Sequence, residues 1–316
     1  MGSLTRFPHG VSSFGVPVFG GGPLITTGKF WFVHSGTGNN GNSGKDSDHP
    51  FASIDYAMGK CTANKGDIII VMPGHTETVS SAGLLDLDVA GTMIYGLGAG
   101  ASRPVINFTT ATSADMDVDA ASITMVNILF TGGFDALVAP VDVNATDFTM
   151  INCEMRDVTG QMTLGILTDA NASRLKLRGF VFNGASAAGG DAAVRIVGGD
   201  GHVIEDFSIF GNFAVAAIEN VTTACTNTTV GGGTGQNFIQ NGLDSATPVA
   251  ITMVSTSTGH IGPNINIRIG VDATSNAANI TEAVVGAAMQ IHQPINICNL
   301  GGEVGMQTNI TASTDA

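Results

Sequence analysis

Four short segments of the chain align with one another: Met125-Val-Asn127-Ile128-Leu-Phe130, Met150-Ile-Asn152-Cys153-Glu-Met155, Leu177-Arg-Gly179-Phe180-Val-Phe182 and Ile204-Glu-Asp206-Phe207-Ser-Ile209. Each has apolar residues at its first, fourth and sixth positions and Asn, Gly or Asp at its third. The third position advances from 127 to 152, 179 and 206, in steps of 25, 27 and 27 residues. A repeat of this length without a helical period is typical of stacked coils made of short strands and turns. It predicts an all-β fold, a right-handed single-stranded parallel β-helix.

Acidic residues alternate with apolar residues upstream of these turns. They are Asp86, Asp117, Asp142 and Asp169, ten residues before a turn residue, and Asp88 and Asp119, eight residues before one. Because successive side chains of a strand point to opposite faces, the apolar residues face the interior and the acids face outward. Strands stacked about 4.8 Å apart would then carry a column of carboxylates.

This column has two interpretations. Hard divalent cations such as Ca2+ take several carboxylate and carbonyl oxygens, so the column is a candidate site for a cation or for a basic partner. The alternative, which we favour from the sequence, is a solvated polar face that keeps the sheet from associating edge to edge.

The composition indicates a long apolar core and an acidic surface. Hydrophobic residues make up 43% of the chain, and its 43 glycines are about twice the usual share. The 12 Lys and Arg against 26 Asp and Glu give a net charge of −14. This balance excludes nucleic acid, whose phosphates require basic clusters, and it disfavours anionic membrane surfaces.

No targeting or membrane segment is expected. Gly and Pro interrupt the early apolar stretch 14–25, which therefore lacks the apolar core of a signal peptide. No run approaches the roughly 18 apolar residues of a transmembrane helix. The four cysteines lie more than 70 residues apart, so we expect free thiols in a protein made in a reducing cytoplasm.

The chain divides into four predicted regions. Residues 1–29 form an extended Gly/Pro-rich arm, and residues 30–80 form an N-terminal cap and first coil with a short helix near 50–61. Residues 81–242 form the β-helix, and residues 243–316 form a C-terminal β-rich cap or assembly module. The arm has no period of its own, so we expect it to anchor on a partner. Its candidate contact residues are Arg6, Phe7, Pro8, Phe14, Pro17 and Phe19.

Two motifs resemble known families. The stretch Lys65-Gly66-Asp67-Ile-Ile-Ile-Val71, followed by Pro73-Gly74 and Glu77, resembles the cap and first coil of pectate-lyase-like β-helix proteins. The arm sequence Arg6-Phe-Pro-His-Gly-Val11 resembles that of tailed-phage virion proteins. Within such proteins, a β-helix implies a trimeric spike, fibre or capsid decoration.

The resemblance favours a non-enzymatic virion protein, a homotrimer made in the host cytoplasm that decorates the capsid. Its expected partner is the major capsid protein or another virion protein, with no nucleic acid, no membrane and no cofactor other than Ca2+. The alternative is a polysaccharide lyase or hydrolase, a tailspike-type depolymerase that uses the acidic face of the β-helix.

The sequence assigns no catalytic residue. Arg174, Lys176 and Arg178 alternate along one strand as candidate bases for a lyase, but an ion pair between Arg178 and Glu205 explains Arg178 better. Exposed aromatic platforms, which sugar-binding grooves often present, are expected to be few. The chain has one Trp and two Tyr, and its Phe residues fall largely in core positions of the repeat.

Overall fold

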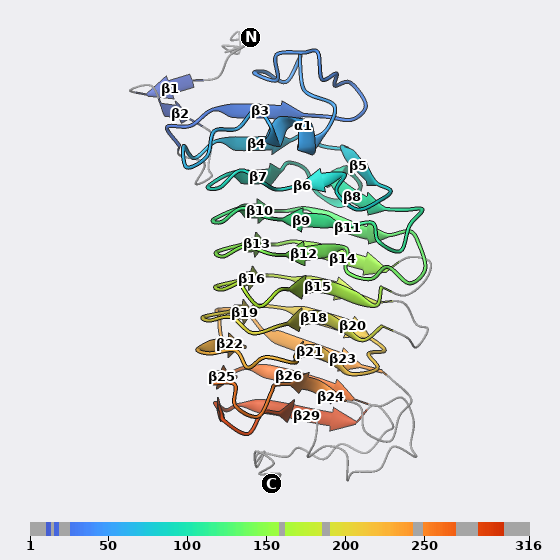
Figure 1. The fold of residues 1–316 in the computed structure, drawn as a ribbon, viewed down its shortest axis with the longest axis vertical. Coiled ribbons are helices and arrows are strands. Elements are labelled where there is room, and N and C mark those ends of the chain that lie inside the picture. The colour runs from blue at the N-terminus through green and yellow to red at the C-terminus, as the bar shows by residue number, and fades with distance from the viewer. Residues whose placement is uncertain are drawn as a thin grey trace, which may run out of the picture.

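The computed structural model describes residues 11–13, 16–18, 26–157, 162–184, 190–242, 249–269 and 284–299. Its body is a column of coils, each built from up to three short strands, with β3 at one end and β29 at the other (Figure 1). The strands form three sheets of 10, 9 and 8 strands, and every pairing within them is parallel. The described residues therefore confirm an all-β parallel solenoid, whereas its predicted right-handed sense stays a prediction.

The three sheets are named here by their strands. Sheet 1 contains β3 (Phe30–Val33), β4 (Ile68–Val71), β7 (Met93–Gly96), β10 (Thr124–Val126), β13 (Thr149–Ile151), β16 (Lys176–Arg178), β19 (Val203–Glu205), β22 (Thr228–Val230), β25 (Gly259–Ile261) and β28 (Met289–Ile291). Sheet 2 contains β5 (Thr76–Val79), β8 (Val105–Phe108), β11 (Leu129–Gly132), β14 (Glu154–Asp157), β17 (Val181–Asn183), β20 (Ser208–Gly211), β23 (Asn237–Asn241), β26 (Ile265–Ile269) and β29 (Ile295–Asn299). Sheet 3 contains β6 (Leu85–Asp86), β9 (Met116–Val118), β12 (Val141–Val143), β15 (Leu164–Thr168), β18 (Ala192–Ile196), β21 (Ala216–Asn220), β24 (Val249–Thr252) and β27 (Val284–Val285).

A tight turn joins sheet 1 to sheet 2 in each of the four coils that contain an aligned segment, at the third position of that segment. Asn127, Asn152, Gly179 and Asp206 have φ values of 57°, 52°, 63° and 55°. Only glycine adopts this left-handed region freely, and Asn and Asp are the other residues that tolerate it best. Asn127 also donates from its side-chain amide to the carbonyl oxygens of Gly96 and Gly98, at 2.9 and 3.0 Å. The turn chemistry read from the sequence is therefore confirmed.

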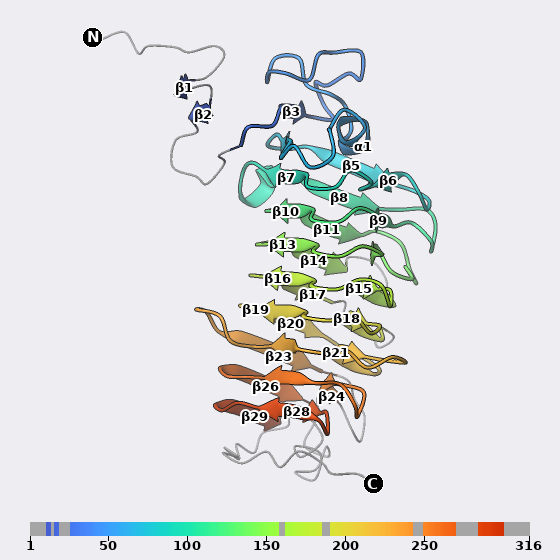
Figure 2. The ribbon, with the colours of Figure 1, turned by 60° about the vertical axis from the view of Figure 1, so that its left-hand side comes forward.

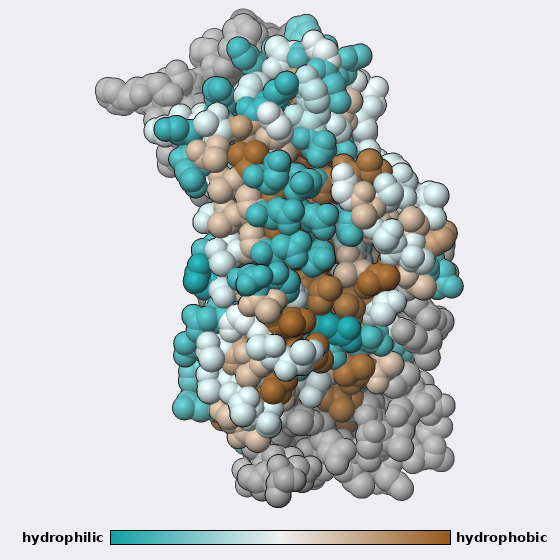
Figure 3. All heavy atoms as spheres, in the orientation of Figure 1, coloured by the Kyte–Doolittle hydropathy of each residue, from teal (hydrophilic) through white to brown (hydrophobic). Residues whose placement is uncertain are grey.

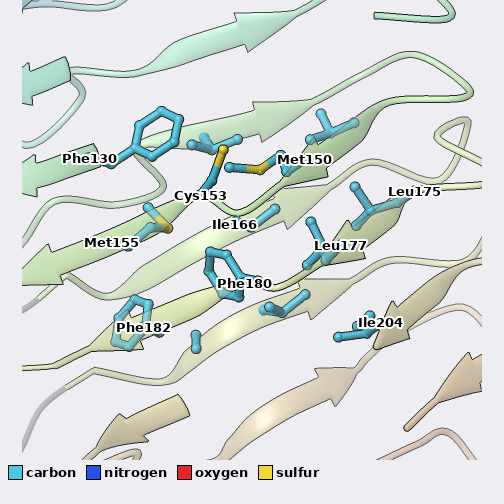
Figure 4. Packing of buried hydrophobic residues seen from close by; sticks show 14 of the residues in the cluster. Phe130, Met150, Cys153, Met155, Ile166, Leu175, Leu177, Phe180, Phe182 and Ile204 are labelled. Carbon is cyan, nitrogen blue, oxygen red and sulfur yellow. The ribbon is translucent and has the colours of Figure 1, made fainter. Parts of the chain in front are cut away.

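The apolar positions of the aligned segments fill the interior of the coils. Met150, Leu177 and Ile204 lie under one another in sheet 1, and Phe180 is fully buried beside them (Figure 4). Cys153 occupies the corresponding core position one coil earlier, and it is buried and free, as predicted. Fully burying one such large apolar side chain stabilises a fold by about 1.5–3 kcal/mol.

A short helix closes the N-terminal end of this core. The helix α1 (Ile54–Met58) begins after Ser53, whose hydroxyl accepts a hydrogen bond from the Tyr56 amide. It buries Ile54, Ala57 and Met58 in the main core cluster. The predicted helix near 50–61 is therefore present but shorter, because Pro50, Phe51 and Ala52 are held by hydrogen bonds to the neighbouring loop and strand. A 3₁₀ turn, η1, spans Gly100–Ser102.

Beyond residue 242 the described strands β24 to β29 continue the same three sheets, so the predicted boundary at 242/243 does not interrupt the parallel pairing. At the other end, β1 (Val11–Ser13) and β2 (Val16–Val18) pair as an antiparallel hairpin (Figure 2).

The part of the chain that the structure describes contains no helix of the length and apolarity needed to span a bilayer.

Candidate functional site: a carboxylate column on sheet 3

Outward-facing aspartates line the first strands of sheet 3. In β9, Met116 and Val118 are fully buried in the core, and Asp117 between them points to the other face. In β12, Val141 and Val143 repeat this arrangement around Asp142. The period-2 alternation thus places the carboxylates as the sequence predicts.

Strand register makes these residues direct neighbours. Asp86 pairs with Asp117 across β6 and β9, and Asp117 pairs with Asp142 across β9 and β12. We refer to Asp86, Asp117 and Asp142 as the carboxylate column. The next two residues in the same line are Leu167 and Arg195, so the column ends at β15.

Asp169 does not belong to this column, contrary to its spacing from Gly179. Its amide donates to the Val143 carbonyl, which places Asp169 next to Asn144 and two residues past the Asp142 line. The physical reason is local: the Asp169 carboxylate accepts hydrogen bonds from the amides of Asn171 and Ala172, at 2.7 and 2.8 Å, and so shapes the following turn.

The two remaining predicted acids, Asp88 and Asp119, are exposed and lie just past the ends of β6 and β9. The side-chain amide of Asn144 donates to the Asp119 carboxylate at 2.9 Å. This rim therefore has hydrogen-bonding partners within the chain, whereas the carboxylate column is closer to the sheet surface and more buried.

Two further acids join the site, although their positions were not singled out in the sequence. Asp115 precedes β9 and carries a buried carboxylate oxygen without a hydrogen-bond partner, and burial raises its pKa. Asp55 comes from α1 and accepts from the Asp86 amide at 3.4 Å; burial raises its pKa too. The alternation Asp115-Met-Asp117-Val-Asp119 was a sequence signal for the first. No sequence pattern linked Asp55 to sheet 3.

Burial and neighbouring negative charges raise the pKa values of the column carboxyl groups. Desolvation, followed by the neighbouring charge of Asp115, raises the pKa of Asp117 to about 6. The same two causes, in the same order, raise the pKa of Asp142 to about 6. A carboxyl group with a pKa in this range can both donate and accept a proton near neutral pH, which an ordinary exposed aspartate cannot.

An apolar margin borders this face. The large hydrophobic side chains that are exposed in the described residues are Leu84, Val138 and Val215, and each lies in a loop that enters a strand of sheet 3. Leu164, Ala139 and Ala192 form a small cluster, with Leu167 packed against it. Figure 3 shows hydrophilic residues gathered over β6, β9 and β12, with hydrophobic residues below them over β15.

A partly buried charge cluster follows at β18 and β21. Arg195 bonds Asp191 at 2.9 Å through Nη2 and bonds Glu219 through Nε. Glu219 is fully buried, and burial raises its pKa. Arg195 is thus a cation on the outer face of sheet 3 that its own neighbours neutralise.

The arginines considered as lyase bases lie elsewhere. Lys176 and Arg178 are in β16 of sheet 1, and Arg178 pairs with Glu205 as predicted. Arg174 sits in the preceding turn and makes two hydrogen bonds to Asp147, at 2.6 and 2.8 Å. None of the three is placed on the strands that carry the carboxylate column.

The remaining predicted site residues belong to the N-terminal arm. Arg6, Phe7, Pro8, Phe14 and Phe19 lie outside the described residues, and Pro17 pairs with Ser12 in the hairpin. Within the ranges that the structure describes, no three His, Cys, Asp or Glu side chains are grouped closely enough to hold a metal ion. The Ca2+ site therefore stays a prediction without geometric support.

Comparisons with known proteins give little beyond the fold. No family model and no curated protein matches the chain. One solved structure that matches is a rhamnogalacturonan lyase, at 12% identity and a TM-score of 0.45, with 83% of this chain and 75% of that chain covered. At this identity and TM-score, the likeness assigns neither an activity nor a substrate to the chain.

The same comparison corrects one expectation. The sequence favoured a protein that is not an enzyme. The matching structure is a lyase, which goes against this expectation, and the expectation is not kept, although a match at this distance assigns no activity to the chain. The comparisons give no support to a virion protein. Capsid binding, a homotrimer and location in a virion stay untested predictions.

Proposed function

We propose that the chain is an enzyme that cleaves glycosidic bonds of a polysaccharide on the outer face of sheet 3. The observation that carries this proposal is the pair Asp117 and Asp142, which lie side by side on adjacent strands with pKa values of about 6. Environments that hold carboxyl groups at such values are concentrated at catalytic sites.

The chemistry requires two carboxyl groups in different protonation states. Mutual repulsion means that the pair loses its two protons in separate steps, so one group keeps a proton at a pH where the other is already ionised. The protonated group donates to the glycosidic oxygen as the bond breaks. The ionised group activates a water molecule or attacks the sugar carbon.

Strand spacing supplies suitable separations. Asp117 and Asp142 belong to neighbouring strands about 4.8 Å apart, whereas Asp86 and Asp142 are two strands apart, about 9.6 Å. Glycosidases that retain configuration place their carboxyl groups about 5–5.5 Å apart, and those that invert it about 6.5–9.5 Å apart. The column accommodates either geometry.

Hydrolysis fits this face better than elimination. A lyase removes a proton beside a sugar carboxylate, and it needs cations to hold that carboxylate. The described strands of sheet 3 contain one cationic side chain, Arg195, and its neighbours Asp191 and Glu219 neutralise it. The aspartates therefore repel an anionic sugar, and cleavage beside an uncharged sugar is favoured. The apolar margin at Leu84 and Val138 offers contact to the apolar face of a sugar ring.

The test is a product analysis on a polysaccharide panel that includes rhamnogalacturonan, polygalacturonate and neutral glucans. We expect new reducing ends at about pH 5–6 without the ultraviolet absorbance of an unsaturated sugar. Reducing ends with that absorbance would replace hydrolysis by elimination and keep the polysaccharide as substrate. No new ends from any member of the panel would overturn the proposal.

A further inference from the structure

The outer face of sheet 2 carries an aromatic and cationic patch that the proposed cleavage reaction does not use. Phe210, Phe238 and Arg268 lie on three successive strands, β20, β23 and β26. The two phenyl rings are 5.1 Å apart and inclined by 34°, and the Arg268 guanidinium lies 5.5 Å from the Phe238 ring centroid. Both rings are half-buried, and Arg268 is exposed. These two Phe residues thus lie outside the core positions that most Phe residues were expected to occupy.

Arg268 differs from the other arginines of the described chain. Arg103, Arg156, Arg174, Arg178 and Arg195 each form a salt bridge with a carboxylate. Among the described residues, no salt bridge engages Arg268. In a chain of net charge −14, an exposed arginine that stacks on an aromatic ring and forms no salt bridge with a described acid is an available anion-binding group.

Amide side chains complete the patch. Gln240 lies in register between Phe210 and Arg268. Asn266 is the strand neighbour of Phe238, and Asn296 donates to its side-chain oxygen at 3.0 Å. The patch thus presents aromatic faces, amides and a guanidinium over three strands, which span about 10 Å.

We propose that this patch, formed by Phe210, Phe238, Gln240, Asn266 and Arg268, binds a glycan chain that carries uronic-acid residues. Aromatic faces pack on the C–H face of a sugar ring, amides bond its hydroxyls, and a guanidinium holds a carboxylate with two parallel hydrogen bonds. One free arginine is too few for a nucleic acid, whose backbone requires a cluster of cations.

The charge of the two faces separates this site from the carboxylate column. Sheet 3 carries Asp86, Asp117 and Asp142 along its outer line, and these repel a uronate. On sheet 2, Glu154 forms salt bridges with Arg103 and Arg156, and no described acid forms a salt bridge with Arg268. An anionic glycan is therefore directed to sheet 2, and this binding does not depend on the proposed cleavage reaction.

The test is calorimetric titration of the full chain with hexagalacturonate in EDTA, with maltohexaose as an uncharged probe of the same length. We expect hexagalacturonate to bind, more weakly as salt rises, and Arg268→Gln and Phe238→Ala each to lower its affinity at least tenfold. Lys176→Gln removes an exposed charge from sheet 1 and serves as the matched control, with unchanged affinity. Asp142→Asn should also leave the affinity unchanged, even where it abolishes cleavage.

Three results would overturn the proposal. They are absence of hexagalacturonate binding, equal affinity for maltohexaose, and equal losses in Arg268→Gln and Lys176→Gln, the last of which indicates unspecific attraction. Because Arg268 is exposed, its replacement leaves the fold intact even if Phe238→Ala does not. If Asp142→Asn loses cleavage but keeps hexagalacturonate binding, or if Arg268→Gln loses binding but keeps cleavage, the two sites act separately.

Discussion

Asp142 lies directly opposite Asp117 in the parallel pair β9 and β12, and the two carboxyl groups share a raised pKa of about 6. The described strands β9 and β12 contain no Lys or Arg that could neutralise either carboxylate. A protein that places two such groups side by side accepts a cost in stability, which is common at sites shaped for catalysis.

That cost should appear as a pH dependence of stability. A carboxyl whose pKa is raised from 3.8 to about 6 binds its proton more tightly in the folded chain, so it destabilises the fold progressively as pH rises through this window. We expect Asp117→Asn to match the wild-type melting temperature near pH 4 and to exceed it by about 2 °C or more near pH 7.

Thermal melts at a series of pH values measure this difference. Asp88→Asn removes an exposed acid from the rim of the same face and is the control, with no pH-dependent gain. A difference between Asp117→Asn and wild type that stays constant across this pH range would contradict a strained carboxyl at position 117.

The reaction should have an acidic optimum. Above about pH 6 both Asp117 and Asp142 are ionised, so the proton donor is lost and kcat/KM falls. A pH–rate profile on any polysaccharide that the enzyme cleaves measures this limb. Activity that rises from pH 6 to pH 8 would exclude these carboxyls as the acid.

Removing Arg195 should uncover a buried charge. Glu219 is fully buried, and one of its carboxylate oxygens has no hydrogen-bond partner. Arg195→Leu leaves this group unpaired and should lower the free energy of unfolding by about 3–5 kcal/mol. Adding Glu219→Leu should recover most of the loss, because Leu167 already occupies the neighbouring position of the same line.

Urea unfolding of the two variants measures this recovery. Arg178→Leu is the matched control, since its exposed pairing with Glu205 contributes only about 0–1 kcal/mol. If the double variant were as unstable as Arg195→Leu, the loss would come from packing around Arg195 rather than from the charge of Glu219.

The turn between sheets 1 and 2 should be destabilised by a side chain at Gly179. A Cβ there would lie 2.3 Å from the Asn152 side-chain oxygen, at a φ of 63°. We expect Gly179→Ala to destabilise the protein by about 1–3 kcal/mol. Gly100→Ala, at a φ of 57° with open space around it, isolates the backbone contribution and should cost less. Equal melting temperatures for the two variants would show that the stacked turns relax.

Much of the fold was accessible from the sequence, because coils that stack in register repeat their core and turn residues. The aligned segments around Asn127, Asn152, Gly179 and Asp206 identified the turns, and the structure gives all four left-handed backbones. The coils beyond residue 242 were missed. Their sheet 1 strands are about 30 residues apart, from Thr228 to Gly259 and Met289, so the shorter period no longer aligns them.

The site was accessible only in part. Alternation within one strand located Asp117 and Asp142, which is local information. Asp169 was assigned to the wrong line because loop length varies between coils, and a count from the next turn carries that variation into the register. Asp55 and the outward Phe210 and Phe238 depend on which distant strands and helices become neighbours, which no local pattern encodes.

The most direct test of the proposed enzyme compares initial rates of reducing-end release by wild type, Asp142→Asn and Asp88→Asn on a polysaccharide cleaved by the wild type. Asp142→Asn should lose about 10²- to 10⁴-fold in kcat while remaining folded, and Asp88→Asn, an exposed acid on the same face, should stay within about threefold of wild type. Full activity in both Asp142→Asn and Asp117→Asn would contradict a catalytic carboxylate column on sheet 3.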